Sequence, residues 1–405
     1  MAGLREMVLM KETALNGVCN GLSDDQDEEC PQLVPAVEPA VNSDEYFTSY
    51  DDVEVHRLMI NDQPRTRAYQ NAIINNAHIF KNKIVMDIGA GTGILSLFAK
   101  KAGARKVYAV EASPLVDVLK EIIELNDEEK IIEVIHGKAE EVDLEDGVKV
   151  DIIISEWMGF YLLHESMLDS VILARDKHLA DDGIVLPSHA KILAAPVQLD
   201  SWVEEQFNSW RDVYGFNMTP MAQKAMEIRL ERGQPEVMHL KEKNMLSEPV
   251  VVAEFDMKWV QREEVISLED KKFLSITKNG NFHGLSIWFD ATFDPHIYED
   301  EYDKPFVRVD LKTGPCDPET HWKQTVLVVP GNMVDGEVEE DEVIGWSLTM
   351  AQSASNARQY TLGLEVLDPG TEEHPVPCDC KMGKCALLKA LLEKEDAEME
   401  ELEEI

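Results

Sequence analysis

Two glutamates, Glu156 and Glu165, lie in the segment SEWMGFYLLHESML among Trp, Met, Phe, Tyr and Leu residues, with no Lys or Arg between them. An ionised carboxylate removed from water costs several kcal/mol unless it is paired or hydrogen-bonded. One interpretation is that both acids face solvent while their neighbours pack inward. The other is that they bind a cationic ligand. A guanidinium suits such a pair better than an ammonium, because its planar fork presents two N–H groups to a carboxylate.

A second candidate site is the glycine-rich loop of VMDIGAGTGILSLFAKKAG, in which Gly89, Gly91 and Gly93 follow a predicted strand. Glycine lets the backbone approach a ligand closely there. Glu111 ends the next predicted strand, at the position where an acid accepts ribose hydroxyls. The spacing is GxGxG rather than GxGxxG, and the acidic Asp87 precedes the loop. Both features favour S-adenosylmethionine over a dinucleotide, because it has an amino group and no phosphate.

The elements that position these residues are short β-branched runs. KIVMDIG, KVYAVEA, IIEVIHG and VDIIISE predict strands, and the segments between the first three have helical spacing. This alternation predicts a parallel sheet wound with helices, which binds ligands at the carboxyl ends of its strands. Glu156 follows the fourth run, and YLLHESMLDSVILARD predicts a helix that includes Glu165. A strand end and the start of the next helix can direct both carboxylates into one space.

The flanking segments suggest further parts of the chain. PRTRAYQNAIINNAHIF predicts a helix with Asp62 as its cap and Pro64 in its first turn. After Pro187, runs such as AKILAAPV and FHGLSIWFDATF predict a mainly antiparallel β domain, interrupted by the helical, aromatic segment SWVEEQFNSWRDVYGFNM. The predicted divisions are a disordered acidic tail (1–42), a helical lid with a cofactor domain (43–187), a β domain (188–370) with an arm at about 200–222, and a Cys-containing linker with an acidic helix or tail (371–405).

The composition of the chain limits the kinds of binding partner that it is expected to have. The chain has 405 residues and a formal net charge of -40, which argues against direct binding of nucleic acid and favours basic partners. The sequence contains no run of eighteen apolar residues, and its start is too polar for a signal peptide, so we expect an intracellular protein without a membrane segment. The six dispersed cysteines are expected to be reduced thiols.

One group of cysteines raises the question of a metal. Cys378, Cys380 and Cys385, together with His374, could supply four zinc ligands. Their spacing is not one of the standard zinc patterns, and we therefore predict no metal.

The motifs resemble those of the protein arginine N-methyltransferases, in the type I branch that makes asymmetric dimethylarginine. SEWMGF with HESML is similar to the family's double-glutamate loop, and THWKQ (Thr320 to Gln324) to its Thr-His-Trp loop. YFTSY with HRLMINDQPRT resembles the N-terminal helical lid, and DIGAGTG the cofactor loop. The resemblance covers about residues 43 to 365, and the sequence of the motifs is most similar to the subfamilies numbered six and two.

The resemblance implies a fold and a set of roles. The fold would be a Rossmann-like S-adenosylmethionine-dependent methyltransferase domain followed by a β barrel with a helical dimerisation arm, in a homodimer. Glu156 and Glu165 would clamp the substrate arginine. His321, paired with Asp62, would orient the loop or accept the departing proton. The cofactor site would comprise His56, Met59, Arg65, Asp87, Gly89, Gly91, Thr92, Gly93, Glu111, Ala139, Glu140 and Met167.

Several of these cofactor residues have a specific implied role. Arg65 would pair with the cofactor's carboxylate, and Asp87 would lie near its amino group. Glu111 would hold the ribose, and Ala139 with Glu140 would contact the adenine. Met59 and Met167 would shape the space around the reacting nitrogen, although methionines are usually core filler.

The implied activity is methylation of arginine in proteins, giving mono- and asymmetric dimethylarginine in histone tails or glycine-arginine-rich proteins, in the nucleus or the cytoplasm. Two other interpretations remain open at this point. One is a catalytically weak methyltransferase-like scaffold that binds Arg-rich partners through the same acidic cleft. The other is a small-molecule methyltransferase, which the two glutamates disfavour because a neutral acceptor would leave them unpaired.

Overall fold

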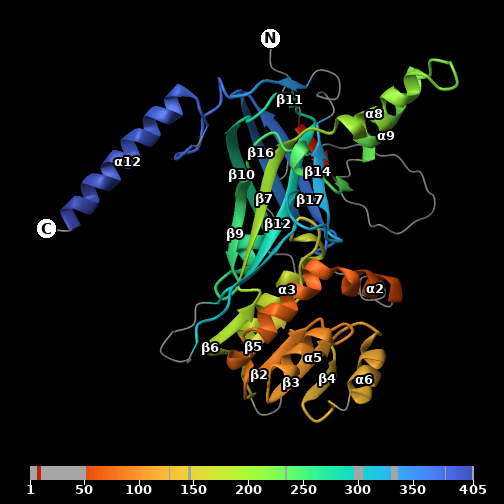
Figure 1. The fold of residues 1–405 in the computed structure, drawn as a ribbon, viewed down its shortest axis with the longest axis vertical. Helices are drawn as coiled ribbons and strands as arrows, with labels where there is room; N and C mark the ends of the chain where they lie inside the picture. Colours follow the sequence, from red (N-terminus) through yellow and green to blue (C-terminus); the bar gives the residue numbers. More distant parts are fainter. Residues whose placement is uncertain are drawn as a thin grey trace.

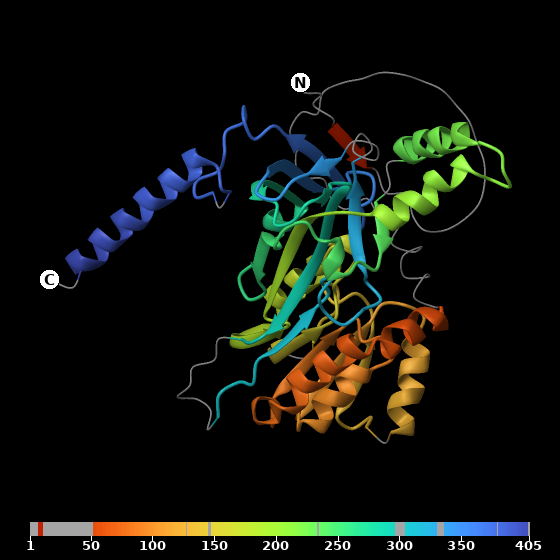
Figure 2. The same cartoon turned by 45° about the horizontal axis from the view of Figure 1, so that its top comes forward.

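The computed structural model describes residues 7–10, 52–126, 128–144, 147–232, 235–295, 304–329, 336–378 and 380–403. An α/β domain forms the lower half of Figure 1, and a β barrel forms the upper half. Two helical elements project from the barrel to opposite sides, and Figure 2 shows the same arrangement after a 45° turn. The predicted fold class is confirmed.

The α/β domain is built on a five-stranded sheet whose neighbouring strands are all parallel, in the order β4-β3-β2-β5-β6. Its strands are β2 (Ile84–Ile88), β3 (Lys106–Glu111), β4 (Ile132–His136), β5 (Val150–Ser155) and β6 (Leu179–Leu186). The helices around them are α5 (Ile94–Lys101), α6 (Val116–Leu125) and α7 (Met167–His178). The four β-branched runs of the sequence correspond to β2, β3, β4 and β5, so the prediction of a parallel sheet is confirmed.

Three helices precede this sheet: α2 (Val53–Asn61), α3 (Gln63–Ile74) and α4 (Ala77–Phe80). In Figure 1, α2 and α3 lie between the sheet and the barrel. The side chain of Asp62 accepts a hydrogen bond from the Arg65 backbone N–H at 3.1 Å, with Pro64 in the first turn, as the sequence predicted. The Tyr69 hydroxyl donates to the Ser155 carbonyl at 2.9 Å. That bond fixes α3 to the end of β5.

The barrel consists of antiparallel sheets. The largest has the order β8-β14-β12-β7-β9, with β13 also paired to β12, and a second has the order β1-β17-β16-β10. The strands of the first are β7 (His189–Val197), β8 (Glu236–Met238), β9 (Val250–Asp256), β12 (Gly284–Phe293), β13 (Val309–Lys312) and β14 (Gln324–Val328). Those of the second are β1 (Met7–Met10), β10 (Ser267–Ser275), β16 (Val343–Gln352) and β17 (Tyr360–Leu367).

Short elements complete the barrel domain: the strand pair β11 (Gly280–Asn281) and β15 (Glu337–Val338), the helix α10 (Arg262–Ile266) and the 3-10 turn η4 (Glu242–Asn244). One cluster of buried apolar side chains extends from the parallel sheet into the barrel. Tyr69 of α3 and Phe293 of β12 belong to it and pack edge to face, with ring centroids 4.8 Å apart. The two domains therefore share a core, which holds the residues at their junction in fixed positions.

The prediction of a disordered tail over residues 1–42 is wrong for Met7–Met10. These residues form β1, which pairs antiparallel with β17 from Met7 opposite Glu365 to Met10 opposite Leu362. Pairing satisfies the backbone groups that β17 would otherwise present at a sheet edge. A four-residue strand in a polar context has no sustained apolar period, so no local pattern predicts this partner. The other residues of the predicted tail lie outside the described ranges.

The predicted arm is a helical hairpin of α8 (Asp200–Gln206), the 3-10 turn η3 (Asn208–Arg211) and α9 (Thr219–Arg232). The aromatic residues of this arm fall into two groups. Phe207 is buried in a cluster with barrel residues, and Trp202 packs against it at 5.6 Å between ring centroids. Tyr214 and Phe216, in contrast, are 97% and 68% exposed.

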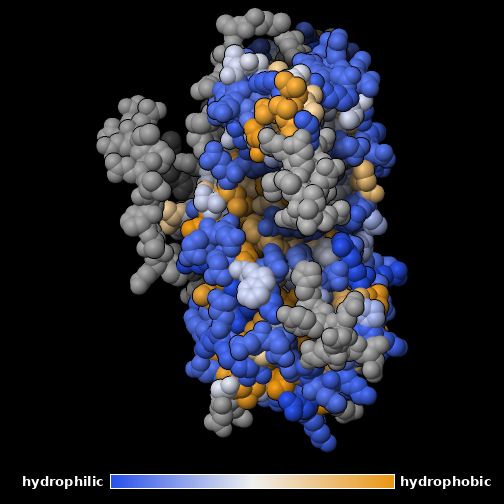
Figure 3. Space-filling view, turned by 90° about the vertical axis from the view of Figure 1, so that its left-hand side faces the viewer, coloured by the Kyte–Doolittle hydropathy of each residue, from blue (hydrophilic) through white to orange (hydrophobic). Residues whose placement is uncertain are grey.

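The chain ends in α12 (Gly383–Glu403), which projects from the barrel on the side opposite the arm. Figure 3 faces this side and shows a mostly hydrophilic surface with a hydrophobic cluster in its upper part. The large exposed apolar residues of α12 are Leu387, Leu388 and Leu391. Among the helices of the described ranges, none combines the length and the apolar character needed to cross a bilayer.

Candidate active site

A cavity of about 240 Å³ lies at the carboxyl end of the parallel sheet, bordered by α2 on one side and by a loop of the barrel on another. Most of the residues that the sequence assigned to the cofactor and to catalysis line it. They are His56, Met59, Arg65, Gly89, Gly91, Thr92, Glu111, Ala139, Glu140, Met167, Glu156, Glu165 and His321. Asp62, Asp87 and Gly93 lie outside the lining.

The glycine loop between β2 and α5 needs glycine for two reasons. All three glycines have positive φ, +70° at Gly89, +53° at Gly91 and +79° at Gly93, a region that other residues rarely adopt. A Cβ at Gly89 would also collide with the methyl group of Met167, and one at Gly93 would collide with Leu119. Gly91 lines the cavity, whereas Gly93 allows α5 to begin close against α6.

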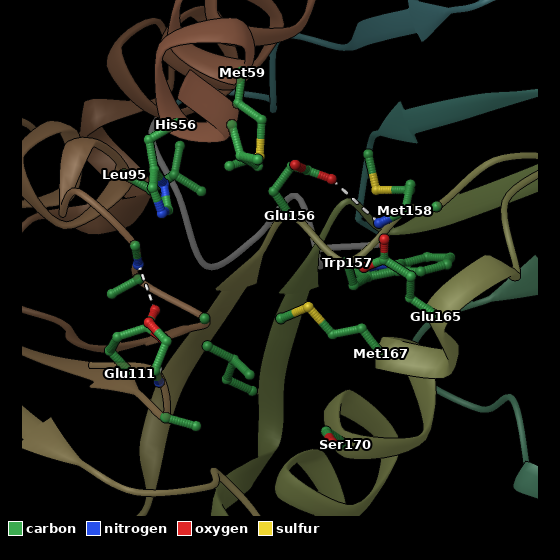
Figure 4. Close-up of a pocket in the computed structure, with 18 of the residues that line it drawn as sticks. His56, Met59, Leu95, Glu111, Glu156, Trp157, Met158, Glu165, Met167 and Ser170 are labelled. Atoms are coloured by element: carbon green, nitrogen blue, oxygen red, sulfur yellow. Dashed lines mark hydrogen bonds between the residues drawn. The ribbon is translucent and has the colours of Figure 1, made fainter. Parts of the chain in front are cut away.

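Glu111 fixes the end of β3 against this loop. One carboxylate oxygen accepts from the Gly91 N–H and the other from the Ser113 N–H, both at 2.7 Å. Figure 4 shows the bond to the glycine loop on the side of the cavity opposite Glu156 and Glu165. Because a carboxylate has about four lone-pair sites, Glu111 retains acceptor capacity for ligand hydroxyls.

Asp87 does not have the position that the sequence suggested. It is fully buried at the end of β2 but faces α5, where it accepts from the Ser96 hydroxyl at 2.6 Å. Successive residues of a strand face opposite sides, and it is the next residue, Ile88, that lines the cavity. Burial raises the pKa of Asp87 to about 7, against the opposing effect of the Ser96 hydrogen bond. Its other carboxylate oxygen has no hydrogen-bond partner among the described residues.

Glu156 follows β5 and binds a guanidinium within the chain. Its Oε2 accepts from Arg65 Nε at 2.9 Å and from Nη2 at 2.6 Å, and both side chains are 9% exposed. Its Oε1 accepts from the Met158 N–H at 3.2 Å, the bond drawn in Figure 4. Burial alone would lower the pKa of Arg65, but the adjacent Glu156 carboxylate raises it. Arg65 was expected to pair with a cofactor carboxylate and Glu156 with a substrate, and the structure pairs the two with each other.

Glu165 precedes α7 instead of lying within it, so the predicted helix start is wrong. It belongs to the 3-10 turn η2 (His164–Ser166), has a φ of +71° and is followed by Ser166 at +51°. Arg358, from the turn between β16 and β17, explains this conformation. Its backbone carbonyl accepts from the Glu165 N–H, and its side-chain Nη1 donates to the Glu165 carbonyl, both at 2.9 Å. A contact between residues so distant in the chain has no signature in a local pattern.

His321 and Asp62 form the pair that the family resemblance implied. Asp62 Oδ2 lies 2.6 Å from His321 Nδ1 and accepts from the His321 backbone N–H at 2.8 Å. Burial alone would raise the pKa of Asp62, but the hydrogen bonds from His321 outweigh burial and lower it. Because the other oxygen of Asp62 caps α3, this one carboxylate joins the lid to the barrel loop.

Two of the lining residues to which the sequence assigned no role, Trp322 and Arg358, hold the loops around the cavity together. Trp322 donates its indole N–H to the Met158 carbonyl at 2.9 Å and so joins the Thr-His-Trp loop to the double-glutamate loop. Its position in THWKQ was a usable signal. Arg358 lies in the polar stretch SASNARQY, which contains no pattern that could have drawn attention to it.

The donor set of the cavity fits S-adenosylmethionine. An acid at the end of β3 suits ribose hydroxyls, the buried cation of Arg65 suits a carboxylate, and the glycine loop leaves backbone accessible between them. The parallel sheet, this loop and the acid pair beside it define an S-adenosylmethionine-dependent methyltransferase of Rossmann-like fold.

Comparison with known proteins identifies the family. Residues 188–366 match the model of the arginine methyltransferase oligomerization subdomain, and residues 58–184 match that of the TRM5/TYW2 methyltransferase domain. The chain is 36% identical to the probable protein arginine N-methyltransferase 6.1 of Oryza sativa subsp. japonica, over 84% of this chain and 94% of that protein. It is 37% identical to protein arginine N-methyltransferase 1 of Saccharomyces cerevisiae, over 78% of this chain and 86% of that protein.

Solved structures agree with these relatives. The Trypanosoma brucei PRMT1 enzyme-prozyme heterotetrameric complex with AdoHcy aligns with a TM-score of 0.68 and 32% identity, over 81% of this chain and 98% of that chain. The chain belongs to the protein arginine N-methyltransferase family. It is an enzyme that methylates arginine in protein substrates with S-adenosylmethionine as cofactor, and its barrel includes an oligomerisation subdomain.

Proposed function

We propose that this enzyme is of type I and forms mono- and asymmetric dimethylarginine in Arg-rich protein segments or histone tails, with Glu156 and Glu165 holding the substrate guanidinium. One observation carries the proposal: a carboxylate oxygen of Glu156 already accepts two N–H groups of a guanidinium, that of Arg65, inside the cavity. The type I product is supported by the resemblance of the double-glutamate and Thr-His-Trp loops to that branch. The net charge of -40 supports a basic substrate.

In this proposal Arg65 exchanges partners. In the structure it neutralises Glu156, which would otherwise be a buried, unpaired acid. When Arg65 turns to the cofactor's carboxylate, Glu156 becomes available to the substrate arginine. Filling the cofactor site thereby prepares the acceptor site, and the enzyme is expected to bind its cofactor first.

The chain's carboxylates then activate a poor nucleophile. An arginine side chain remains protonated in proteins, and its delocalised charge makes each nitrogen weakly nucleophilic. Glu156 and Glu165 draw positive charge toward the nitrogens they bind and leave the third more electron-rich. The bound cofactor supplies the methyl group on a sulfonium. Holding the acceptor nitrogen within about 3 to 3.5 Å of that group contributes much of the rate.

A strong base is not required at the outset, because the proton becomes easier to lose as the new N–C bond forms. His321 lines the cavity, and its Nδ1 lies against Asp62, which orients the ring. In the proposal His321 accepts the proton, directly or through water. Met59 and Met167 line the same cavity and limit the space around the acceptor nitrogen.

We also propose a homodimer formed through the arm of residues 200–232. The oligomerisation subdomain supports it, as do the exposed side chains of Tyr214, Phe216, Met218 and Met221 on the arm. Apolar groups gathered on a projecting element indicate a protein interface. The C2 arrangement is by far the commonest among homo-oligomers.

The experiment that tests the activity is incubation of the purified protein with methyl-labelled S-adenosylmethionine and either an Arg-rich or a histone-tail peptide, followed by amino-acid analysis. The proposal expects labelled monomethyl- and asymmetric dimethylarginine. Symmetric dimethylarginine would contradict the type I assignment. Cofactor binding without transfer to either peptide would instead support an Arg-binding scaffold.

A further inference from the structure

A cluster of four side chains far from the catalytic cavity is composed entirely of metal-binding groups. His374, Cys378, Cys380 and Cys385 lie between β17 and the first turn of α12, and their donor atoms all lie within 4.8 Å of one another. The three Sγ atoms are 3.6, 3.4 and 3.2 Å from His374 Nδ1. Each of the four residues is buried, with at most 9% of its surface exposed. We refer to these residues as the Cys–His cluster.

The distances from His374 Nδ1 to the three sulfur atoms are close to those of a tetrahedral zinc site. Zn–S bonds of about 2.3 Å and Zn–N bonds of about 2.0–2.1 Å place tetrahedral ligands about 3.6 Å apart for N and S and about 3.8 Å apart for two S atoms. The observed N–S distances lie close to this separation. A disulfide would require two sulfur atoms about 2.05 Å apart, whereas the cysteines here are free thiols.

The tautomer of His374 points to the same ligand. Its Nε2 lies 3.0 Å from the Pro369 carbonyl oxygen, which can only accept a hydrogen bond. Nε2 therefore carries the proton, and in the neutral ring the lone pair of Nδ1 faces the three sulfur atoms. Donation of the distal N–H to a carbonyl is the usual arrangement of a metal-binding histidine. The ring is held in this orientation by stacking on Phe273, with centroids 3.7 Å apart and planes 7° apart.

We propose that His374, Cys378, Cys380 and Cys385 bind one Zn²⁺ in a structural site that attaches the C-terminal helix α12 to the barrel. All four positions of a tetrahedral ion would be filled by the chain, which leaves none for substrate or water, as in structural zinc sites. The HxxxCxCxxxxC spacing explains why the sequence alone did not predict a metal. The donors meet because the chain turns from a loop into the helix, and a spacing rule does not encode that turn.

Neighbouring contacts show what the ion would hold in place. Phe273 of β10 belongs to the same buried cluster as the cysteines, and the Lys381 backbone N–H donates to the Ser275 hydroxyl of β10 at 2.8 Å. Lys271 of β10 forms an ion pair with Glu372 at 3.1 Å. The loop before α12 thus lies along one strand of the barrel. A metal ion bound by the Cys–His cluster would cross-link this loop to the first turn of α12. In the described part of α12, the apolar side chains of Leu387, Leu388 and Leu391 are exposed and do not pack against the barrel core.

The test is the zinc content of the full-length, tag-free protein, purified with ZnCl₂, desalted and analysed by inductively coupled plasma mass spectrometry. One zinc ion per chain is expected. Cys380→Ser and Cys385→Ser should each lose it and melt at a lower temperature. Cys316→Ser, at an exposed free cysteine outside the cluster, and the Cys19→Ser/Cys30→Ser double variant should both retain one zinc.

Release from the wild-type protein keeps the proposal testable if the cluster variants do not fold. A mercurial that attacks thiolates should release one equivalent of zinc to a colorimetric indicator. A folded wild-type protein that carries only trace zinc would overturn the proposal. So would a zinc ion retained by both cluster variants, or a disulfide between two of the three cysteines in peptide mass spectra of the native protein.

Discussion

The catalytic cavity and the Cys–His cluster both bury polar side chains, but these side chains find their interaction partners in different ways. In the cavity, polar groups pair with each other: the Arg65 guanidinium with the Glu156 carboxylate, and the His321 ring with the Asp62 carboxylate. In the proposal above, Arg65 exchanges the Glu156 carboxylate for that of the cofactor. The Cys–His cluster contains four lone-pair donors around one point, with no cation among its members. A site that binds and releases ligands has internal substitutes for them, whereas a site for one permanent ion has none.

This difference predicts separable effects. Changes in the cavity should alter cofactor binding or methyl transfer while the fold persists, and changes in the Cys–His cluster should alter the attachment of α12 while chemistry in the cavity persists.

Loss of the arm's exposed aromatic residues should have the largest effect, because it removes a proposed partner subunit instead of one contact. The double variant Tyr214→Ser/Phe216→Asp leaves Trp202 and Phe207 in their internal cluster. It is expected to be a monomer in light scattering, with methyl transfer largely lost. Trp259→Ser is the matched control, since Trp259 is 67% exposed outside the arm. A fully active monomeric variant, or a fully active monomeric wild-type protein, would contradict the proposed dimer.

Glu156→Gln should change both chemistry and stability. Turnover should fall by about a hundredfold or more, the typical effect of removing a preorganised electrostatic group. The cofactor-free protein should also lose about 3 kcal/mol of unfolding free energy, because Arg65 remains buried without its counter-charge. Urea unfolding with and without cofactor measures the second effect. Unchanged stability of the cofactor-free variant would show that the Arg65–Glu156 pair is not formed in solution.

Glu111→Ala should weaken cofactor binding by about 1 to 3 kcal/mol in calorimetry, because it removes charge-assisted hydrogen bonds. The Gly91 and Ser113 N–H groups also lose their acceptor, which loosens the loop. Glu121→Ala, at an exposed position of α6, is the control and should bind normally. Equal affinities for the two variants would mean that the ribose site is elsewhere.

The smallest effect concerns Asp87 and pH. Its pKa of about 7 lies above the ordinary value of 3.8, so between these values the folded protein binds more protons than the unfolded chain. Stability of the cofactor-free protein should therefore fall as pH rises through this window, by less than about 1.4 kcal/mol per pH unit from this group. Asp87→Asn should remove that contribution, so the stability of the variant relative to the wild type should increase as pH rises. If thermal unfolding between pH 4 and 8 gives parallel curves, Asp87 is not buried as described.

Local patterns in the sequence were sufficient for much of the fold. Alternation of β-branched runs with helical segments predicted the parallel sheet, and the Asp62 cap with Pro64 predicted the start of α3. They failed where a distant residue decides the conformation. The turn at Glu165 depends on Arg358, and β1 depends on the edge of β17.

The candidate site shows the same limit. Its residues could be chosen because strand ends and loop motifs bring them to one sheet edge, and most line the cavity. Apart from the His321–Asp62 pair, their partners could not be chosen. The pairing of Arg65 with Glu156 joins residues 91 positions apart. The side of the sheet to which the Asp87 side chain points depends on its place in the strand pleat. Only the folded chain shows that the four donors of the Cys–His cluster converge on one point near α12.

The most direct test of the account is single-turnover methylation of an arginine peptide by Glu165→Gln, with cofactor binding measured in parallel. The substitution keeps the size of the side chain and leaves the Arg65–Glu156 pair intact, but removes the charge that would polarise the substrate. We expect unchanged folding, nearly unchanged cofactor affinity and a rate lower by about a hundredfold or more. A solvent-facing glutamate would instead change stability by less than about 0.5 kcal/mol and leave transfer alone. A variant that binds cofactor and transfers methyl at the wild-type rate would contradict the assignment of the two glutamates.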